Sequence, residues 1–270
     1  MDASCYPWVL DEIWYLHLAI DDSTGTVVGA YFDRKETLNA YYHVFYQILK
    51  NYGIPAMFYT DRRTLFEYKR KNNAFDNDDT YTQFSYACKN LGINIKTTSV
   101  AQAKGRIERM NQTFQSRLPI ELRRACITNI EDANNFLNSY LQKFNVPFSL
   151  PLNTIKSVCE EQPTDEKINH TLAVLSERKI DSGHCIKYKN KFYLPVSKKG
   201  TPVYLKRNST CLVIKSFNGQ LYRNIVDQLY VLEEVPAHQR ISQEFNIERI
   251  PVTTRKKYIL PLDHRWISNV

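Results

Sequence analysis

The start of the chain alternates between strand-like and helix-like patterns of apolar residues. Apolar, β-branched and aromatic residues at 12–20 and 26–32 flank the turn formers of 21–25, a pattern that predicts a β-hairpin. Apolar residues at helical spacing then predict a helix over 36–52, and Gly53 supplies a left-handed stop. A hairpin is thus followed by a helix that returns the chain toward the sheet.

The next segments continue this alternation. The short apolar run 55–60 predicts a buried strand that ends at Asp61. After the polar stretch 67–80, which predicts a mobile loop, the pattern favours a helix over 82–91 and a strand over 93–98. Strands that alternate with helices indicate an α/β fold.

Two further helices complete a first domain near residue 150. The first carries an apolar stripe beside a polar stripe of Lys104, Glu108, Gln112 and Gln115, so one face packs and the other faces a site. Pro119 is expected to kink or end this helix. Thr128 and Glu131 have the spacing of a capping box and predict the start of the second helix.

The pattern changes to short alternating runs after residue 175, which predicts an all-β second domain. We expect a domain over 1–150, a linker over 151–175, a β domain over 176–235 and a basic tail over 236–270. Asn218-Gly219 is the strongest hairpin signal. The expected strands are 186–188, 192–194, 203–205, 212–217 and 221–226.

Charge adds a candidate partner. The formal net charge is +8, and residues 161–270 carry 18 Lys or Arg against 11 Asp or Glu. A nucleic acid is the simplest polyanionic partner for such asymmetry, although solvated basic surfaces without a partner are common. The chain has no signal-like start and no apolar run long enough for a bilayer, so we expect a cytoplasmic protein without a membrane partner. The six cysteines form no C-x-x-C pair, which favours reduced thiols over disulfides or zinc.

Asp61 at a strand end and Glu108 on a helix predict a two-metal site. Phosphodiester cleavage by two cations requires hard oxygen ligands that converge from different elements. A first strand beside the strand of Asp61 would bring a third aspartate, either Asp2 or Asp11.

Several motifs resemble bacterial insertion-sequence transposases of the retroviral integrase superfamily, in particular the ISNCY-type group. They are Asp2-Ala3-Ser4, Ile20-Asp21-Asp22-Ser23-Thr24-Gly25, Thr60-Asp61 and Lys104-Gly105-Arg106-Ile107-Glu108-Arg109. The resemblance maps the acidic triad of the family onto Asp2, Asp61 and Glu108. It implies a ribonuclease H-like integrase catalytic core over 1–150, with a mixed five-stranded sheet and helices. A small all-β barrel of the kind found in Mu-type transposases is implied over 176–235.

The resemblance also implies an activity. Two Mg²⁺ or Mn²⁺ ions would be held by the triad while DNA ends are cleaved and joined to target DNA, with the protein as a homo-oligomer on the transposon ends and target. Lys104, Arg106, Arg109 and Gln115 are candidates for holding phosphates, against the alternative of a solvated helix face.

Two other readings of the sequence stay open. Family members have a helix-turn-helix region and most of the first strand before the first motif, so either the gene product is truncated or this segment is encoded elsewhere. We expect a shortened first strand that holds Asp2 poorly. The main alternative is a truncated, inactive transposase remnant that only binds DNA. A ribonuclease H-type or other structure-specific nuclease is a less favoured alternative.

Overall fold

The computed structural model describes residues 1–10, 12–61, 82–98, 105–148, 159–197, 200–225 and 228–235. Five of these residues, Asp61, Thr98, Phe148, Ile225 and Gln228, are described by their backbone alone. The predicted loop 67–80, the tail 236–270 and Lys104 lie outside the described residues. The chain divides into two compact units, one of Met1–Glu177 with Leu212–Val231 and one of Arg178–Cys211 with the segment from Leu232.

The first unit begins with an antiparallel sheet of order β1-β2-β3. Its strands are β1 (Asp2–Val9), β2 (Glu12–Ile20) and β3 (Val27–Asp33), and the β2–β3 pair confirms the predicted hairpin. In the register of β1 and β2, Asp2 pairs with Leu18 at the first position of the strand. Asp2 is therefore the first residue of an eight-residue strand.

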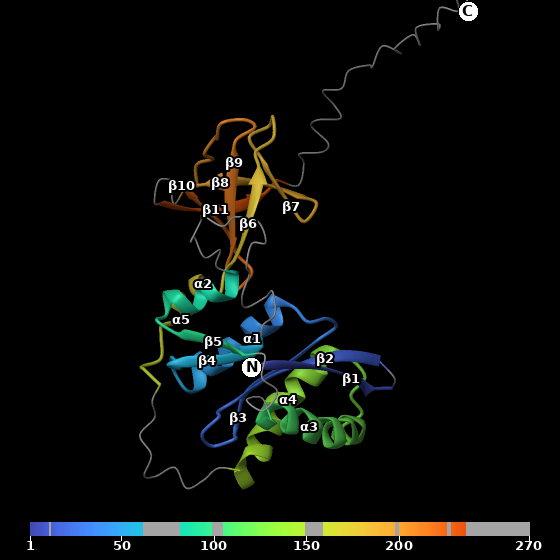
Figure 1. Ribbon diagram of the computed structural model, residues 1–270. Helices are drawn as coiled ribbons and strands as arrows, with labels where there is room; N and C mark the ends of the chain where they lie inside the picture. The colour runs from blue at the N-terminus through green and yellow to red at the C-terminus, as the bar shows by residue number, and fades with distance from the viewer. Residues whose placement is uncertain are drawn as a thin grey trace, which may run out of the picture. The chain divides into compact units, whose positions relative to one another are not determined.

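Helices cover both faces of this sheet, as Figure 1 shows. Leu16 and Leu18 of β2 are fully buried against α3 (Gly105–Arg124) and α4 (Ile130–Asn145). The residues between them and after them, His17 and Ala19, face α1 (Leu38–Asn51) on the other side. Because successive side chains of a strand point to opposite faces, one strand contributes to two cores. This arrangement confirms the predicted α/β class.

A two-stranded parallel sheet follows in the same unit. It consists of β4 (Met57–Asp61) and β5 (Asn94–Thr98), joined through α2 (Gln83–Asn90). The amino group of Met1 donates a hydrogen bond to the carbonyl oxygen of Tyr59 at 2.8 Å, which links the start of β1 to β4. The five strands of the predicted mixed sheet thus occur as a three-stranded and a two-stranded sheet with this bond between them.

Three side-chain amides cover the edge of the β1-β2-β3 sheet at β3. Each amide accepts on its oxygen from a backbone N–H of β3 and donates from its nitrogen to the carbonyl of the same residue. The pairs and their two distances are Gln47 with Ala30 (2.9 and 3.0 Å), Asn134 with Phe32 (2.7 and 3.1 Å) and Asn145 with Val27 (3.0 and 2.8 Å). An edge strand leaves a row of unpaired backbone groups, and these amides satisfy part of that row.

Two details of the helices differ from the sequence expectation. The N-cap of α4 is Asn129, whose side chain accepts from the N–H of Asp132, so the predicted capping box of Thr128 and Glu131 is wrong. Both positions carry good capping residues, and the chain uses the one a single step later. Pro119 does not end α3, which continues to Arg124.

The later strands form a six-stranded sheet of order β6-β9-β10-β11-β8-β7. Before it come the short 3-10 helix η2 (Val146–Phe148) and α5 (Asp165–Thr171), which lies inside the predicted linker. The strands are β6 (Val174–Lys179), β7 (Ile186–Tyr188), β8 (Lys191–Val196), β9 (Thr210–Lys215), β10 (Leu221–Ile225) and β11 (Gln228–Glu234).

One turn of this sheet agrees with the sequence expectation, and one expected strand is not observed. The predicted turn of Asn218 and Gly219 joins β9 to β10, and Gly219 has φ +89°, which a glycine adopts without strain. The strand expected at 203–205 is wrong, because the chain there makes an isolated bridge between Val196 and Pro202 instead. Among the described residues, no helix is long and apolar enough to cross a membrane.

Candidate catalytic site

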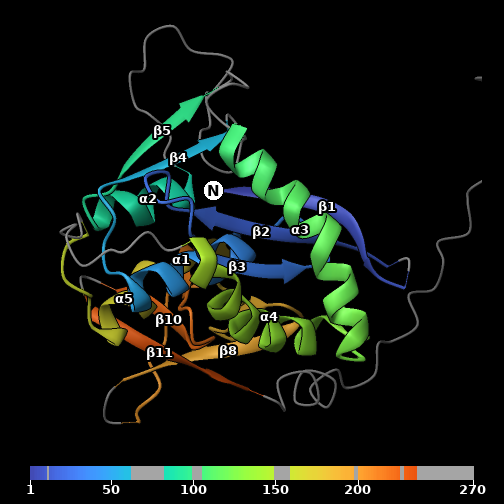
Figure 2. The ribbon, with the colours of Figure 1, turned by 90° about the horizontal axis from the view of Figure 1, so that it is seen from below.

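The site is built where α3 crosses the start of β1, as Figure 2 shows. Trp8, near the end of β1, is buried in the core that α3 and α4 share, and Tyr6 packs against this core. Asp2 and Ser4 are earlier residues of the same parity, so they belong to the same face of the strand. The face that α3 covers is therefore apolar along most of β1 and polar at its first residues.

Two side-chain hydrogen bonds connect this polar end of β1 to α3. Nδ2 of Asn111 donates to Oδ2 of Asp2 at 3.2 Å, and Nε2 of Gln115 donates to Oγ of Ser4 at 2.6 Å. Asn111 and Ser4 are 7% and 8% exposed. The polar contact therefore lies inside the packed layer between helix and strand.

The Asn111 amide is satisfied on one side alone. A carboxylate can accept hydrogen bonds but cannot donate them unless it is protonated, so the amide nitrogen has to face Asp2. The other atom of the amide, Oδ1, is then buried without a hydrogen-bond partner in the part of the chain that the structure describes. An unsatisfied buried acceptor costs about 1–3 kcal/mol, so the arrangement reduces stability unless a donor arrives.

Glu108 lies in the first turn of α3, one turn before Asn111, and its side chain is exposed. Residues three apart on a helix are neighbours on its surface, which puts Glu108 on the side of α3 that carries Asn111. Glu108 is thus an available anionic group near the start of β1.

Asp61 is the last residue of β4, opposite Thr98 of the parallel strand β5. Its side chain is outside the described residues. The backbone still gives its neighbourhood, because Tyr59, two residues earlier, accepts the hydrogen bond from Met1. The two strands that carry Asp2 and Asp61 are therefore in contact.

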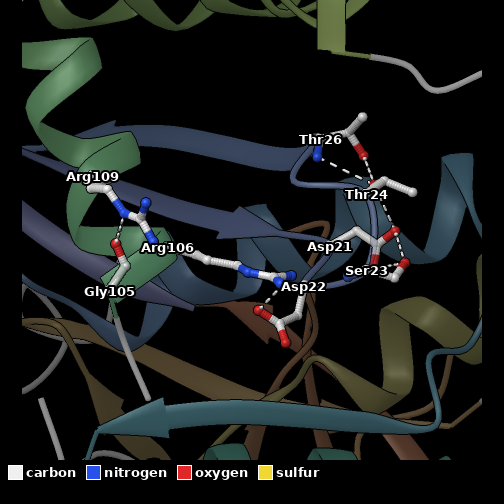
Figure 3. Close-up of polar contacts among 8 residues, drawn as sticks. All are labelled: Asp21, Asp22, Ser23, Thr24, Thr26, Gly105, Arg106 and Arg109. Atoms are coloured by element: carbon white, nitrogen blue, oxygen red, sulfur yellow. Dashed lines mark hydrogen bonds and ion pairs between the residues drawn. The ribbon is translucent and has the colours of Figure 1, made fainter. Parts of the chain in front are cut away.

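Arg106 and Arg109, two of the residues predicted to hold phosphates, have partners within the protein, shown in Figure 3. Arg106 forms an ion pair with Asp22 at 3.5 Å, with side chains that are 57% and 85% exposed. Nε of Arg109 donates to the carbonyl of Gly105 at 2.9 Å. Gln115 contacts Ser4 as described above. The role of these residues toward DNA stays a prediction, as does that of Lys104.

The loop of Asp22 has the turn chemistry predicted for it. Burial raises the pKa of Asp21, but hydrogen bonds from Thr24 and Ser23 outweigh it, so the pKa lies below its usual value. Asp21 is therefore engaged in its own turn, also drawn in Figure 3. No group of three or more His, Cys, Asp or Glu side chains that could hold a metal occurs among the described side chains, which do not include that of Asp61.

The sequence alone assigned no role to Ser4, which lies within a motif, or to Asn111, which lies two residues after one. The signal was present in their spacing, because Asn111 is three residues after Glu108 on a helix and Ser4 is two residues after Asp2 on a strand. Each lies on the same face as a predicted carboxylate. Their hydrogen bonds depend on the packing of α3 on β1, which the local pattern does not contain.

Comparisons with known proteins agree with the motifs. No protein-family model matches the chain. The chain is 50% identical over 266 residues to the transposase for insertion sequence IS1202 of Streptococcus pneumoniae, an alignment that covers 98% of the chain and 57% of the relative. It is 34% identical over 152 residues to the putative transposase y4bF of Sinorhizobium fredii (strain NBRC 101917 / NGR234), which covers 56% of the chain and 33% of that relative.

A solved structure, a simian T-cell lymphotropic virus intasome in complex with the PP2A regulatory subunit B56 gamma, matches with 14% identity over 87% of this chain and 76% of the solved chain. The TM-score of 0.43 is too low to establish a shared fold.

The chain is thus similar to bacterial insertion-sequence transposases, in agreement with the motifs. The particular protein that carries this similarity is the IS1202 transposase, whose alignment covers almost the whole of this chain. The chain spans about 57% of that relative's length.

Proposed function

We propose that the chain is the catalytic part of a DNA transposase that cleaves DNA ends and joins them to target DNA. The observation that carries the proposal is the contact of three elements at the first residues of β1. Asn111 of α3 bonds Asp2, and Met1 bonds Tyr59 of β4, two residues before Asp61. The strand, the strand end and the helix that carry Asp2, Asp61 and Glu108 therefore approach one another.

The proposed fold of this part is a ribonuclease H-like integrase core followed by a small β-barrel. The strand order β1-β2-β3, the parallel pair β4 and β5 and the bond from Met1 to Tyr59 support a single mixed sheet of five strands. The six-stranded antiparallel arrangement that follows supports the barrel. The boundaries proposed for these domains are those expected from the sequence.

The donor set suits two Mg²⁺ or Mn²⁺ ions. Asp2 supplies carboxylate oxygens, and Oδ1 of Asn111, which has no partner among the described residues, is an acceptor that a further donor could use. Hard divalent cations favour such oxygen ligands. When bound, the ions would lower the pKa of water and neutralise charge on the phosphate. Asp2, Asp61 and Glu108 would hold them.

The other residues of the site would act on DNA. Arg106 is mostly exposed, and its ion pair with Asp22 is long, so it can exchange that carboxylate for a phosphate. Arg109 and Lys104 would add positive charge beside it. The partners proposed are transposon ends and target DNA, with further copies of the chain assembled on them and with a helix-turn-helix segment for end recognition.

Strand transfer tests the proposal. Labelled element ends and plasmid target are incubated with Mg²⁺ or Mn²⁺ and either the wild-type chain or Glu108→Gln. We expect joined products from the wild type and at least a hundredfold less from the variant, because a neutral amide is a poor cation ligand. Glu121→Gln makes the same change later in α3 and is expected to keep activity. Equal activity of wild type and Glu108→Gln contradicts the catalytic assignment, and a wild type that binds DNA without joining it favours the inactive alternative.

A further inference from the structure

Asn111 differs from the amides that bind β3. Gln47, Asn134 and Asn145 each use both amide atoms, whereas Asn111 uses its nitrogen and leaves a buried oxygen unpaired. We infer that Asn111 and Gln115 are positioning residues, which set the register of α3 on β1 and orient the Asp2 carboxylate toward a bound divalent cation. This inference rests on the proposed function and deepens it.

The spacing of the two hydrogen bonds supports a fixed register. Asp2 and Ser4 are two residues apart on a strand, a distance of about 6.6 Å at a rise of about 3.3 Å per residue. Asn111 and Gln115 are four residues apart on a helix, about 6 Å at 1.5 Å per residue. The spacing of the two donors along α3 therefore matches the spacing of the two acceptors along β1. A shift of α3 by one turn breaks both and moves Glu108 by about 5.4 Å relative to Asp2.

The orientation of Asp2 follows from the same contact. The Asn111 N–H occupies Oδ2 of Asp2, which restricts the rotation of the carboxylate about its χ angles. The unpaired Oδ1 of Asn111 is left to accept from a donor, such as a water molecule that enters with a cation. A buried acceptor without a partner lowers stability, and such unfavourable features are expected at functional sites.

The main test replaces Asn111 with leucine, which has the same number of side-chain heavy atoms and removes both amide groups. Two quantities are measured on the whole chain without DNA, the midpoint of thermal unfolding without metal and the affinity for Mn²⁺ by the electron paramagnetic resonance signal of the free ion. We expect Asn111→Leu to unfold at the wild-type temperature or above, because an unsatisfied buried oxygen is lost. We also expect it to bind Mn²⁺ at least tenfold more weakly.

The matched control is Asn138→Leu, the same change at an exposed position of α4. It should leave the Mn²⁺ affinity unchanged. A purely structural role for Asn111 predicts the reverse of our expectation, namely a lower unfolding temperature with unchanged Mn²⁺ affinity. That result overturns the inference. If Asn111→Leu does not fold, Asn111→Ala replaces it, and wild-type Mn²⁺ affinity in that variant has the same meaning.

A double-mutant cycle tests whether Asn111 acts through Asp2. In an Asp2→Asn background, Asn111→Leu should lower the Mn²⁺ affinity no further, since the carboxylate that it orients is gone. An additional tenfold loss in that background contradicts the inference.

Gln115→Leu separates positioning from direct DNA contact. A positioning role predicts weaker Mn²⁺ binding without DNA, whereas a phosphate contact predicts weaker DNA binding at unchanged Mn²⁺ affinity, which overturns the role assigned to Gln115. Failure of the proposed function has a different signature. In that case the wild type binds Mn²⁺ no better than Glu108→Gln, whatever residue stands at position 111.

Discussion

Buried side-chain amides contact the β1-β2-β3 sheet in two places, at the edge of β3 and on the face of β1 that α3 covers, and they bond differently there. At β3, three amides bond backbone groups, and each uses its oxygen and its nitrogen. On the face of β1, Asn111 and Gln115 bond side chains instead, and Oδ1 of Asn111 has no partner among the described residues. The amides at β3 therefore have partners for both of their polar atoms, whereas the Asn111 amide has a partner for its nitrogen alone among the described residues.

This difference distinguishes two kinds of buried amide by their hydrogen bonds. A buried amide that bonds both ways contributes to stability, and its loss leaves two backbone groups unpaired. A buried amide that bonds one way costs stability in the metal-free protein. We propose that a cation held by the Asp2 carboxylate offsets this cost at Asn111.

The largest expected effect on stability comes from Gln47→Leu. This change leaves the N–H and the carbonyl of Ala30 without their partners, and Ala30 is 1% exposed. Each of the two unsatisfied groups costs about 1–3 kcal/mol, so we expect the free energy of unfolding to fall by about 2–6 kcal/mol. Urea denaturation followed by circular dichroism measures it.

The control for this prediction is Gln142→Leu, at an exposed position of α4, which should stay within about 0.5 kcal/mol of the wild type. A Gln47→Leu variant that is as stable as the control removes the contrast between the amides at β3 and the Asn111 amide. In that case the amides at β3 contribute no more than surface residues do.

An intermediate effect is expected from His17, which is also buried and satisfied on one side. Its Nδ1 lies 3.3 Å from the carbonyl of Tyr31, and its Nε2 has no partner. Burial lowers the pKa of His17 below 6.5, so below that pH the unfolded chain takes up a proton that the folded chain does not. Stability is therefore complete above about pH 6.5 and falls as the pH drops, by at most about 1.4 kcal/mol per pH unit.

His17→Asn tests whether His17 causes this pH dependence, and it also tests whether a buried group without a partner can lie outside the candidate site. The variant cannot take up the proton, so its unfolding free energy should depend less on pH between 5 and 6.5 than that of the wild type. An identical pH dependence in both contradicts the assignment to His17. Strand transfer should be unchanged, because His17 packs against Tyr41 on the α1 face and has no predicted carboxylate beside it.

The sequence predicted those elements whose periodicity is long and regular. The helix expected at 36–52 is observed at Leu38–Asn51, and the hairpin that precedes it is confirmed. It did not reveal α5, which has seven residues and a single buried one, Ile168. Nor did it reveal β6, whose second half is charged and exposed. Short elements take their structure from neighbours, and the neighbours are distant in the chain.

The residues of the candidate site also differ in whether the local sequence indicates them. Asp2, Asp61 and Glu108 were predicted because the motifs around them are dense, and these roles remain predictions. Asn111 and Ser4 were not predicted because their hydrogen bonds join residues more than 100 positions apart. Arg106 was predicted from its position beside Glu108, but the sequence did not indicate that Asp22 would be its partner in the protein.

The smallest effect on stability is expected from Asp22→Asn, which breaks the ion pair with Arg106. Both side chains are largely exposed, so the free energy of unfolding should change by less than about 0.5 kcal/mol. Binding to DNA should change more, because the substitution frees a guanidinium beside the candidate site. We expect tighter binding of a DNA duplex at low salt and a dependence of log Kd on log salt that is steeper by about one.

Two variants decide whether this gain belongs to Arg106. Glu121→Gln frees Arg124 near the other end of α3, where the ion pair is 3.2 Å long, and removes the same charge. An equal gain in both variants means that net charge alone is responsible and that Arg106 has no special access to DNA. Adding Arg106→Gln to Asp22→Asn should cancel the gain, because the freed phosphate ligand is then absent. A gain that persists in the double variant excludes Arg106 as that ligand and makes its pairing with Asp22 a purely structural contact.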